Sequence, residues 1–150
     1  MILRPAAAEE APALAAVHAR AFDHPWSGED IAELMASPGV YALAADASGP
    51  LGFILCRAIA GEAEILTLAV DPDFRRQGLA RALVEAAAAI ARTADADVMF
   101  LEVSAENLPA IGLYEGAGFV RAGRRPRYYD RGAAGMVDAI IMRLELGRTG

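Results

Sequence analysis

The spacing of apolar residues and the signals that start helices predict four helices along the chain. In the first of these segments, apolar side chains recur every three or four positions, which is typical of an amphipathic helix. Ser27 followed by Asp30 marks a second helix start, because a capping hydroxyl and a carboxylate both favour the first turn. The expected helices are Glu9–Phe22, Ser27–Met35, Gly78–Thr93 and a segment from Asn107 to the glycines of EGAGF.

Apolar runs separated by turn residues predict the strands. The turn residues DASGP lie between two such runs and predict a β-hairpin. The run VMFLEV is apolar almost without a break, which is typical of a strand buried on both faces. The expected strands are Ile2–Arg4, Val40–Ala45, Leu51–Ile59, Ala63–Val70, Val98–Val103, Phe119–Ala122 and Val137–Glu145, the last two joined by the loop GRRPRYYDRGAAG.

The order of these elements predicts a mixed α/β (α+β) fold. A length of 150 residues fits one compact domain, residues 1–150. The passage from strand to helix to strand between Ala63 and Val103 implies a parallel pair with a right-handed crossover, inside an otherwise antiparallel sheet. In such sheets a ligand binds at the carboxyl ends of the parallel strands.

Composition narrows the classes of function. A net charge of −6 argues against generic nucleic-acid binding. No apolar run approaches the roughly 20 residues that are needed to span a membrane, so a cytoplasmic protein is expected. The chain contains no lysine, which excludes a phosphate-loop lysine and Schiff-base chemistry.

Neither metal binding nor thiol chemistry is expected. Cys56 is the only cysteine and lies in the apolar run LGFILCRAIA, where a buried, unreactive thiol is expected. His18 and His24 lack the carboxylate or cysteine spacing of a metal site. Neither histidine is expected to be catalytic.

The stretch FRRQGLARAL joins the strand ending in VDP to the long helix. Gly78 has no side chain and lets the backbone approach a ligand closely. The first N–H groups of the helix lack intrahelical partners and lie at the positive end of the helix dipole. With Arg75, Arg76 and Arg81 nearby, this turn is expected to bind a pyrophosphate. An isolated turn of this kind would more often be a solvated surface turn, so the interpretation depends on its position between strand and helix.

The segment ILTLAVDPDFRRQGLARALVEAA resembles the acetyl-coenzyme A (acetyl-CoA) binding core of the GCN5-related N-acetyltransferase (GNAT) superfamily. Its signature, Q/R-x-x-G-x-G/A, is matched by Arg75, Gly78 and Ala80. The segment LEVSAENLPAIGLYEGAGF is similar to the closing motif of the same fold. The resemblance implies a mostly antiparallel sheet with a central, splayed parallel strand pair and helices on both faces.

Further motifs narrow the resemblance to the RimI-type ribosomal-protein alanine N-acetyltransferases. These motifs are HPWS, RRPRYY and DAIIM, and the similarity runs from about Arg4 to Leu146. It implies transfer of acetyl from acetyl-CoA to the N-terminal alanine of a small-subunit ribosomal protein, without metal, nucleic acid or membrane. Two alternatives stay open: a GNAT enzyme that acts on lysine side chains or small amines, and a CoA-binding module without catalysis.

The resemblance also implies where acetyl-CoA binds. Backbone at the end of one strand would pair with the pantetheine arm like an added strand, and one N–H would polarise the thioester carbonyl. Asn107 would bind the same arm, although asparagine at this place equally suits a helix cap. The expected cofactor-binding residues are Leu68, Ala69, Val70, Arg76, Gln77, Gly78, Leu79, Ala80, Arg81 and Asn107.

Two side chains are expected to carry the proton transfers. By the resemblance, Tyr114 is the general acid for the departing sulfur, since a phenol with a pKa near 10 is protonated at neutral pH. Glu102 matches the family's proton acceptor, whereas Glu64 matches the base of the histone-acetyltransferase branch. We favour Glu102 because it lies in a strongly apolar strand, and Glu64 stays a second candidate on the substrate side.

Three aromatic residues are expected at the acceptor site. Tyr128 and Tyr129 lie in the predicted loop where N-terminal acetyltransferases hold the peptide backbone. Trp26, in HPWS, would close the opposite wall or else plug the start of the second helix.

Overall fold

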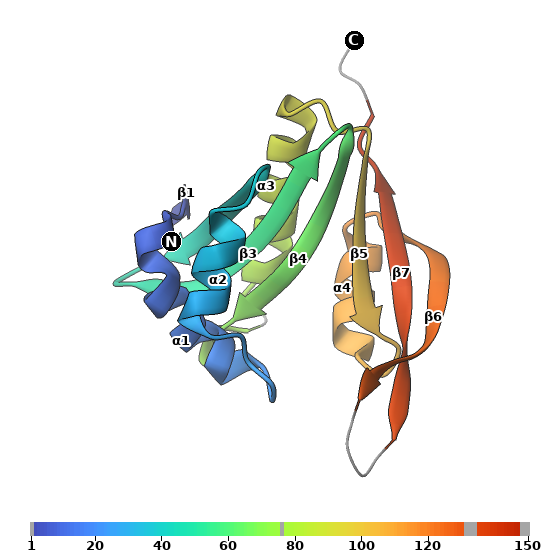
Figure 1. Ribbon diagram of the computed structural model, residues 1–150, viewed down its shortest axis with the longest axis horizontal. Helices are drawn as coiled ribbons and strands as arrows, with labels where there is room; N and C mark the ends of the chain where they lie inside the picture. Colours follow the sequence, from blue (N-terminus) through green and yellow to red (C-terminus); the bar gives the residue numbers. More distant parts are fainter. Residues whose placement is uncertain (1, 76, 131–134, 148–150) are drawn as a thin grey trace.

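Seven strands form one mixed sheet in the computed structural model, which describes residues 2–75, 77–130 and 135–147 (Figure 1). The strand order is β1-β2-β3-β4-β5-β7-β6, and every neighbouring pair is antiparallel except β4 with β5. The predicted fold class and parallel pair are confirmed. The strands are Ile2–Pro5 (β1), Val40–Asp46 (β2), Pro50–Ile59 (β3), Glu62–Val70 (β4), Val98–Ser104 (β5), Val120–Asp130 (β6) and Met136–Glu145 (β7).

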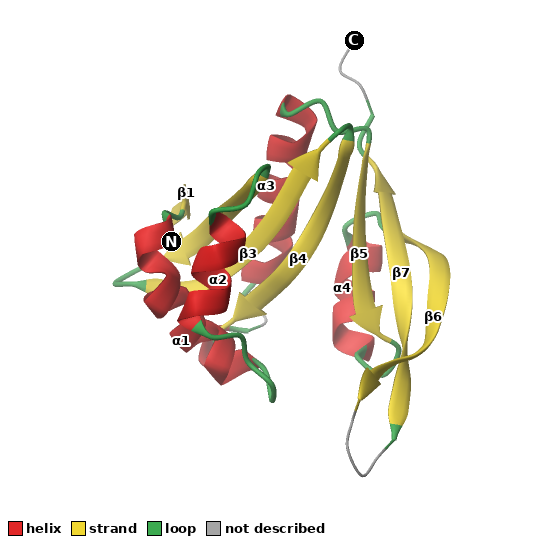
Figure 2. Ribbon diagram, in the orientation of Figure 1, coloured by secondary structure: helices red, strands yellow, loops and turns green. Residues whose placement is uncertain are grey.

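Helices cover both faces of the sheet (Figures 1 and 2). Leu14 of α1 and Ile31 of α2 share a core with Phe53 of β3 on one face, while α3 and α4 belong to the core of the other face. None of the described helices is long and apolar enough to cross a membrane. The helices are Ala11–Ala21 (α1), Gly28–Met35 (α2), Leu79–Thr93 (α3) and Leu108–Gly116 (α4), with 3₁₀ turns at Ala8–Glu10 and Pro72–Phe74.

The first two helices start close to the predicted signals. Ser27 caps α2, because its Oγ accepts a hydrogen bond from the Asp30 N–H over 3.0 Å. The start of α1 is two residues later than predicted, at Ala11 rather than Glu9, and a 3₁₀ turn precedes it. Pro12 lies in the first turn of α1, where a proline is tolerated because its missing N–H would have no helical partner.

The parallel pair separates along its length (Figure 1). Residues 62–64 of β4 pair with residues 98–100 of β5, and the pairing stops there. Beyond this point β4 stays on β3 as far as Val70, and β5 stays on β7 as far as Ser104. Two strand edges therefore diverge toward their carboxyl ends, as the predicted splay requires.

A bulge in β4 lies where the separation begins. Thr67 pairs with Leu55 and Ile65 pairs with Cys56, so Leu66 is an extra residue on β4. A bulge bends its strand and increases the local twist. A bend at this position turns the end of β4 away from β5.

The edge strand β6 differs from the prediction. A strand limited to Phe119–Ala122 and followed by a loop is wrong, because β6 continues through the arginine-rich segment. Asp138 of β7 holds the irregular part of β6 by accepting hydrogen bonds from the Arg127 N–H and from Arg124 Nε, and these bonds lower its pKa. Pro126 is tolerated there because edge strands accept prolines and bulges.

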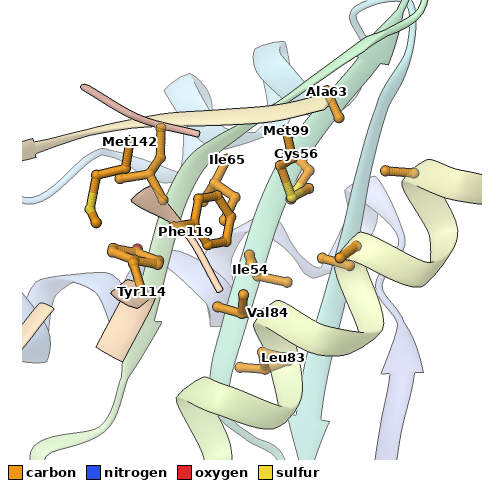
Figure 3. Close-up of a cluster of buried hydrophobic side chains, with 14 of the residues drawn as sticks. Ile54, Cys56, Ala63, Ile65, Leu83, Val84, Met99, Tyr114, Phe119 and Met142 are labelled. Carbon is orange, nitrogen blue, oxygen red and sulfur yellow. The ribbon is translucent and has the colours of Figure 1, made fainter. Parts of the chain in front are cut away.

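The core between the sheet and the helices α3 and α4 anchors one candidate catalytic side chain (Figure 3). Leu83 and Val84 of α3, Met142 of β7 and Phe119 are fully buried in it. Burial of each such side chain contributes about 1.5–3 kcal/mol. Tyr114 of α4 belongs to the same cluster, so packing fixes the orientation of its ring.

Candidate active site

The turn before α3 places the first N–H groups of the helix beside an open glycine position. Gly78 is the N-cap of α3 and has a left-handed backbone, with φ 78° and ψ 7°. The first intrahelical bond runs from the Ala82 N–H to the Gly78 carbonyl over 3.0 Å, so the N–H groups of residues 79–81 precede it. Apart from its two chain neighbours, no atom of the described residues lies within 4 Å of a Cβ added at Gly78. This arrangement suits an anion that approaches the helix start closely.

Polar and cationic side chains surround this turn. Arg75 and Gln77 are exposed. Arg81 donates from Nε to Glu85 over 2.8 Å, and its guanidinium lies beside Gly116 of α4. Leu79 is buried and anchors the helix start, while Ala80 is half-buried. The prediction for Arg76 lies outside the described residues.

The separated end of β4 and the start of α4 lie on either side of the splay (Figure 1). Leu68, Ala69 and Val70 form the last residues of β4, beyond its pairing with β5. Asn107 caps α4, because its Oδ1 accepts a hydrogen bond from the Ala110 N–H over 3.2 Å. The cap is thus observed, and the bond of Asn107 to the pantetheine arm stays a prediction.

Tyr114 lies in the interior, on the α3–α4 side of the sheet. Its ring meets the Phe119 ring edge to face, with 5.6 Å between the centroids. Burial raises the pKa of Tyr114 well above its ordinary value, and the nearby Cys56 and Tyr129 add smaller contributions. The phenol is therefore protonated at neutral pH.

Glu102 and Glu64 point to the opposite face from Tyr114. On each strand the residues before and after the glutamate are buried in the α3–α4 core, and successive side chains of a strand alternate between faces. Glu64 is exposed and lies where β4 and β5 still pair. Glu102 lies two residues beyond the last paired residue of β5, Phe100, and its side chain is 25% exposed. Of the two carboxylates, only Glu102 borders the separated part of the splay.

An arginine that the sequence reasoning missed joins Glu102 to the two tyrosines. The Arg125 Nε lies 3.2 Å from Glu102 Oε1. The Arg125 Cζ lies 5.0 Å from the centroid of the Tyr128 ring, which meets the Tyr129 ring edge to face at 5.1 Å. Both tyrosines lie on β6, not in the predicted loop. No local signal distinguishes Arg125 from the neighbouring arginines, because its role depends on a residue of β5.

Trp26 is held by a histidine that was not expected to take part. Trp26 lies half-buried just before α2, and its backbone N–H donates to Nδ1 of His18 over 3.1 Å. His18 Nε2 lies 3.1 Å from Thr67 Oγ1. His24 is exposed. Thr67 is 49 positions from His18, so the chain offers no local signal for the contact.

Thiol chemistry has no support among these residues. Cys56 is buried, as predicted, and burial raises the pKa of its thiol to about 12. In the described part of the chain, no group of three or more His, Cys, Asp or Glu side chains is arranged to hold a metal ion.

Comparison with known proteins decides the family. The family model described as Acetyltransferase (GNAT) family matches residues 9–119. The chain belongs to this GNAT family. Its sequence is similar to that of the ribosomal protein bS18-alanine N-acetyltransferase of Escherichia coli (strain K12). The two are 35% identical over 135 residues, which cover 90% of each chain. The protein is therefore an acyltransferase.

Solved structures of GNAT proteins agree with this assignment. The crystal structure of the ribosomal-protein-S18-alanine N-acetyltransferase from Escherichia coli superposes with a TM-score of 0.91 and 32% identity, over 99% of this chain and 96% of that one. The NatC complex bound to Gag peptide and CoA gives a TM-score of 0.83 and 25% identity, over 97% of this chain and 98% of that one. A GNAT fold of this shape thus holds CoA in a structural neighbour.

Proposed function

We propose that the protein transfers an acetyl group from acetyl-CoA to the α-amine of an N-terminal alanine on a small-subunit ribosomal protein. The observation that carries the proposal is the similarity to the bS18-alanine N-acetyltransferase over 90% of both chains. The location that this function implies is the cytoplasm, where ribosomal proteins are made.

The described residues fit acetyl-CoA. The open space at Gly78 and the N–H groups of the first turn of α3, residues 79–81, suit the pyrophosphate. The separated edge of β4 at residues 68–70 suits the amides of an extended pantetheine arm. When bound, acetyl-CoA supplies the activated acetyl group as a thioester.

Glu102 is the proposed acceptor of the proton that the amine loses. It borders the splay on the face opposite to Tyr114, and its carboxylate is accessible. Arg125 now pairs with this carboxylate, so an incoming amine would share Glu102 with the guanidinium or displace it. Glu64 lies at the narrow end of the splay and stays the second candidate.

Tyr114 is the proposed donor of the proton that the sulfur gains. Its raised pKa keeps the phenol protonated across the neutral range. Because Tyr114 and Glu102 lie on opposite faces of the sheet, one group can give a proton while the other takes one, without competition for the same proton.

An α-amine is the easier acceptor for such a site. Its pKa is about 7.7–8.0, against about 10.4 for lysine, which corresponds to roughly 3.4 kcal/mol of deprotonation cost. The α-amine is therefore partly neutral at pH 7, and a carboxylate suffices as the base. Lysine would require stronger activation.

Mass spectrometry of reaction products tests the proposal. The protein is incubated with acetyl-CoA and an Ala-starting peptide of the ribosomal protein, beside an N-blocked peptide that contains lysine. We expect a single acetyl group on the α-amine of the first peptide and none on the second. Acetylation of the lysine peptide alone, or of neither peptide, would contradict the proposal, and activity on small amines alone would assign the enzyme to another substrate class.

A further inference from the structure

His18 is a buried histidine for which the proposed chemistry has no use. It lies on α1 and is 1% exposed. Its ring stacks on Phe22 with 4.2 Å between centroids and on Trp26 with 5.2 Å, and it lies against Phe53 of β3 at 6.1 Å. A polar ring enclosed among aromatic side chains needs a partner for each nitrogen, because an unpaired buried polar group is costly.

Both ring nitrogens of His18 have such a partner. The backbone N–H of Trp26 donates to Nδ1, so Nδ1 carries no proton. The proton is then on Nε2, which donates a hydrogen bond to Thr67 Oγ1. Burial lowers the pKa of His18, which favours this neutral form of the ring.

The two partners belong to different parts of the proposed site. Trp26 precedes α2 and is the candidate wall for the acceptor peptide. Thr67 lies on β4 between the bulged Leu66 and Leu68, where the strand begins its separated course. His18 thus joins the acceptor side of the site to the strand that is proposed to hold acetyl-CoA.

We propose that His18 is a positioning residue, which fixes Trp26 and the acceptor wall to β4 through Thr67. This inference rests on the proposed function, because it concerns how that acceptor is placed. His18 acts through its two partners and touches no reacting atom. Its loss is expected to weaken use of the acceptor and to leave acetyl-CoA binding unchanged.

Three substitutions separate the contributions of the two hydrogen bonds. His18→Leu removes both bonds and keeps an apolar side chain of moderate size in the aromatic cluster. Thr67→Val removes only the acceptor on β4 and keeps the branched shape, whereas Thr67→Ser keeps the hydroxyl and serves as the conservative rescue. His24→Asn is the matched control, because His24 is an exposed histidine two residues before Trp26.

Steady-state kinetics with the Ala-starting peptide give the first readout. For His18→Leu and Thr67→Val we expect the peptide KM to rise about tenfold, the size expected when a buried hydrogen bond is lost. The Kd for acetyl-CoA is expected to stay within about twofold of wild type by titration calorimetry. Thr67→Ser and His24→Asn are expected to retain the wild-type peptide KM.

Fluorescence gives a second readout that does not depend on activity. Trp26 is the only tryptophan of the chain, so emission excited at a wavelength that the four tyrosines do not absorb reports on its surroundings alone. Acrylamide quenching of this emission is expected to increase about twofold in His18→Leu and Thr67→Val. Without the hydrogen bonds of His18, the segment that carries Trp26 is held less firmly and the indole becomes more exposed. The two control variants are expected to quench as wild type does.

Each outcome bears on the inference. A folded His18→Leu protein with wild-type peptide KM and wild-type quenching would overturn it, and so would a loss of stability with neither readout changed. If His18→Leu does not fold, the comparison of Thr67→Val with Thr67→Ser tests the inference by the same two measurements, the peptide KM and the quenching. Failure of the proposed function would be seen separately: the wild-type protein would not acetylate the Ala-starting peptide, while His18→Leu would still be quenched more than wild type. If His18→Leu and wild type are quenched equally, the role of His18 is overturned, whatever the enzyme acetylates.

Discussion

Gly78→Ala tests whether the start of α3 binds acetyl-CoA. Gly78 has a φ of 78°, and apart from its two chain neighbours no atom of the described residues lies within 4 Å of a Cβ there, so the substitution strains the backbone without a clash. The left-handed backbone costs a non-glycine residue about 1–2 kcal/mol. The reduced freedom of the unfolded chain offsets about 0.4–1 kcal/mol of this. We expect a net loss near 1 kcal/mol, which lowers Tm by about 2–4 °C for a chain of this size.

The effect on ligand binding is expected to exceed the effect on stability. In the wild type, acetyl-CoA at 100 times its Kd should stabilise the fold by about 2.7 kcal/mol, which raises Tm by roughly 5–11 °C. In Gly78→Ala the new methyl group would occupy the open space at the start of α3, where the pyrophosphate is proposed to bind. A tenfold weaker Kd would remove about 1.4 kcal/mol of that stabilisation, or roughly half of the rise in Tm.

Gly61→Ala supplies the matched control. Gly61 has a φ of 83° and open space at its Cβ, but it lies in the turn before β4, at the opposite end of that strand from Val70. It should lose the same stability as Gly78→Ala and keep the full rise in Tm with acetyl-CoA. Differential scanning fluorimetry with and without acetyl-CoA, supported by calorimetric Kd values, makes the comparison. If Gly78→Ala keeps the wild-type rise, the pyrophosphate does not bind at α3 and the reasoning fails.

Three further predictions concern the proton-transfer groups and the buried histidine. Tyr114→Phe should lower kcat about 10²-fold or more with the acetyl-CoA Kd unchanged, and an unchanged kcat would remove Tyr114 from the mechanism. Glu102→Gln should lower kcat on the Ala-starting peptide by a similar factor while Glu64→Gln stays within about threefold, and the reverse order would make Glu64 the base. Because burial lowers the pKa of His18, the unfolded chain binds its proton more readily, and stability should fall as pH drops below about 6.5, by up to about 1.4 kcal/mol per pH unit. Urea unfolding at pH 7.5 and 5.5 measures this loss, which should persist in His24→Asn and shrink in His18→Asn; equal losses in both variants would contradict it.

The parts of the fold that follow local rules could be predicted from the sequence. Ser27 caps α2 through a residue three positions away, and Gly78 opens α3 because only glycine adopts its backbone easily. The parallel pair follows from the strand–helix–strand order, since a crossover connection requires it. In each case the physical cause lies within the segment that shows the pattern.

The features that were missed depend on contacts between distant segments. The arginine-rich segment reads as a loop by composition, yet Asp138 of the next strand organises it into β6. Arg125 is distinguished from its neighbours only by its contact with Glu102 of β5. The Nε2 atom of His18 has Thr67 as its hydrogen-bond partner, which lies 49 positions away in the sequence. None of these partners can be chosen from residue type alone, because many other arginines and hydroxyls would serve as well.

The splay is the feature that connects this fold to its chemistry. Strands that separate give up backbone hydrogen bonds to each other, and such groups must be satisfied by water or by a ligand. An extended ligand that carries amides can take the place of the missing strand for residues 68–70, which a continuous sheet would not allow. Along this separated stretch, Glu102 lies on one face of the sheet and Tyr114 on the other. In the proposed mechanism, Glu102 as proton acceptor and Tyr114 as proton donor act from opposite sides of the sheet, and the loss of strand pairing provides the edge that binds the acyl donor between them.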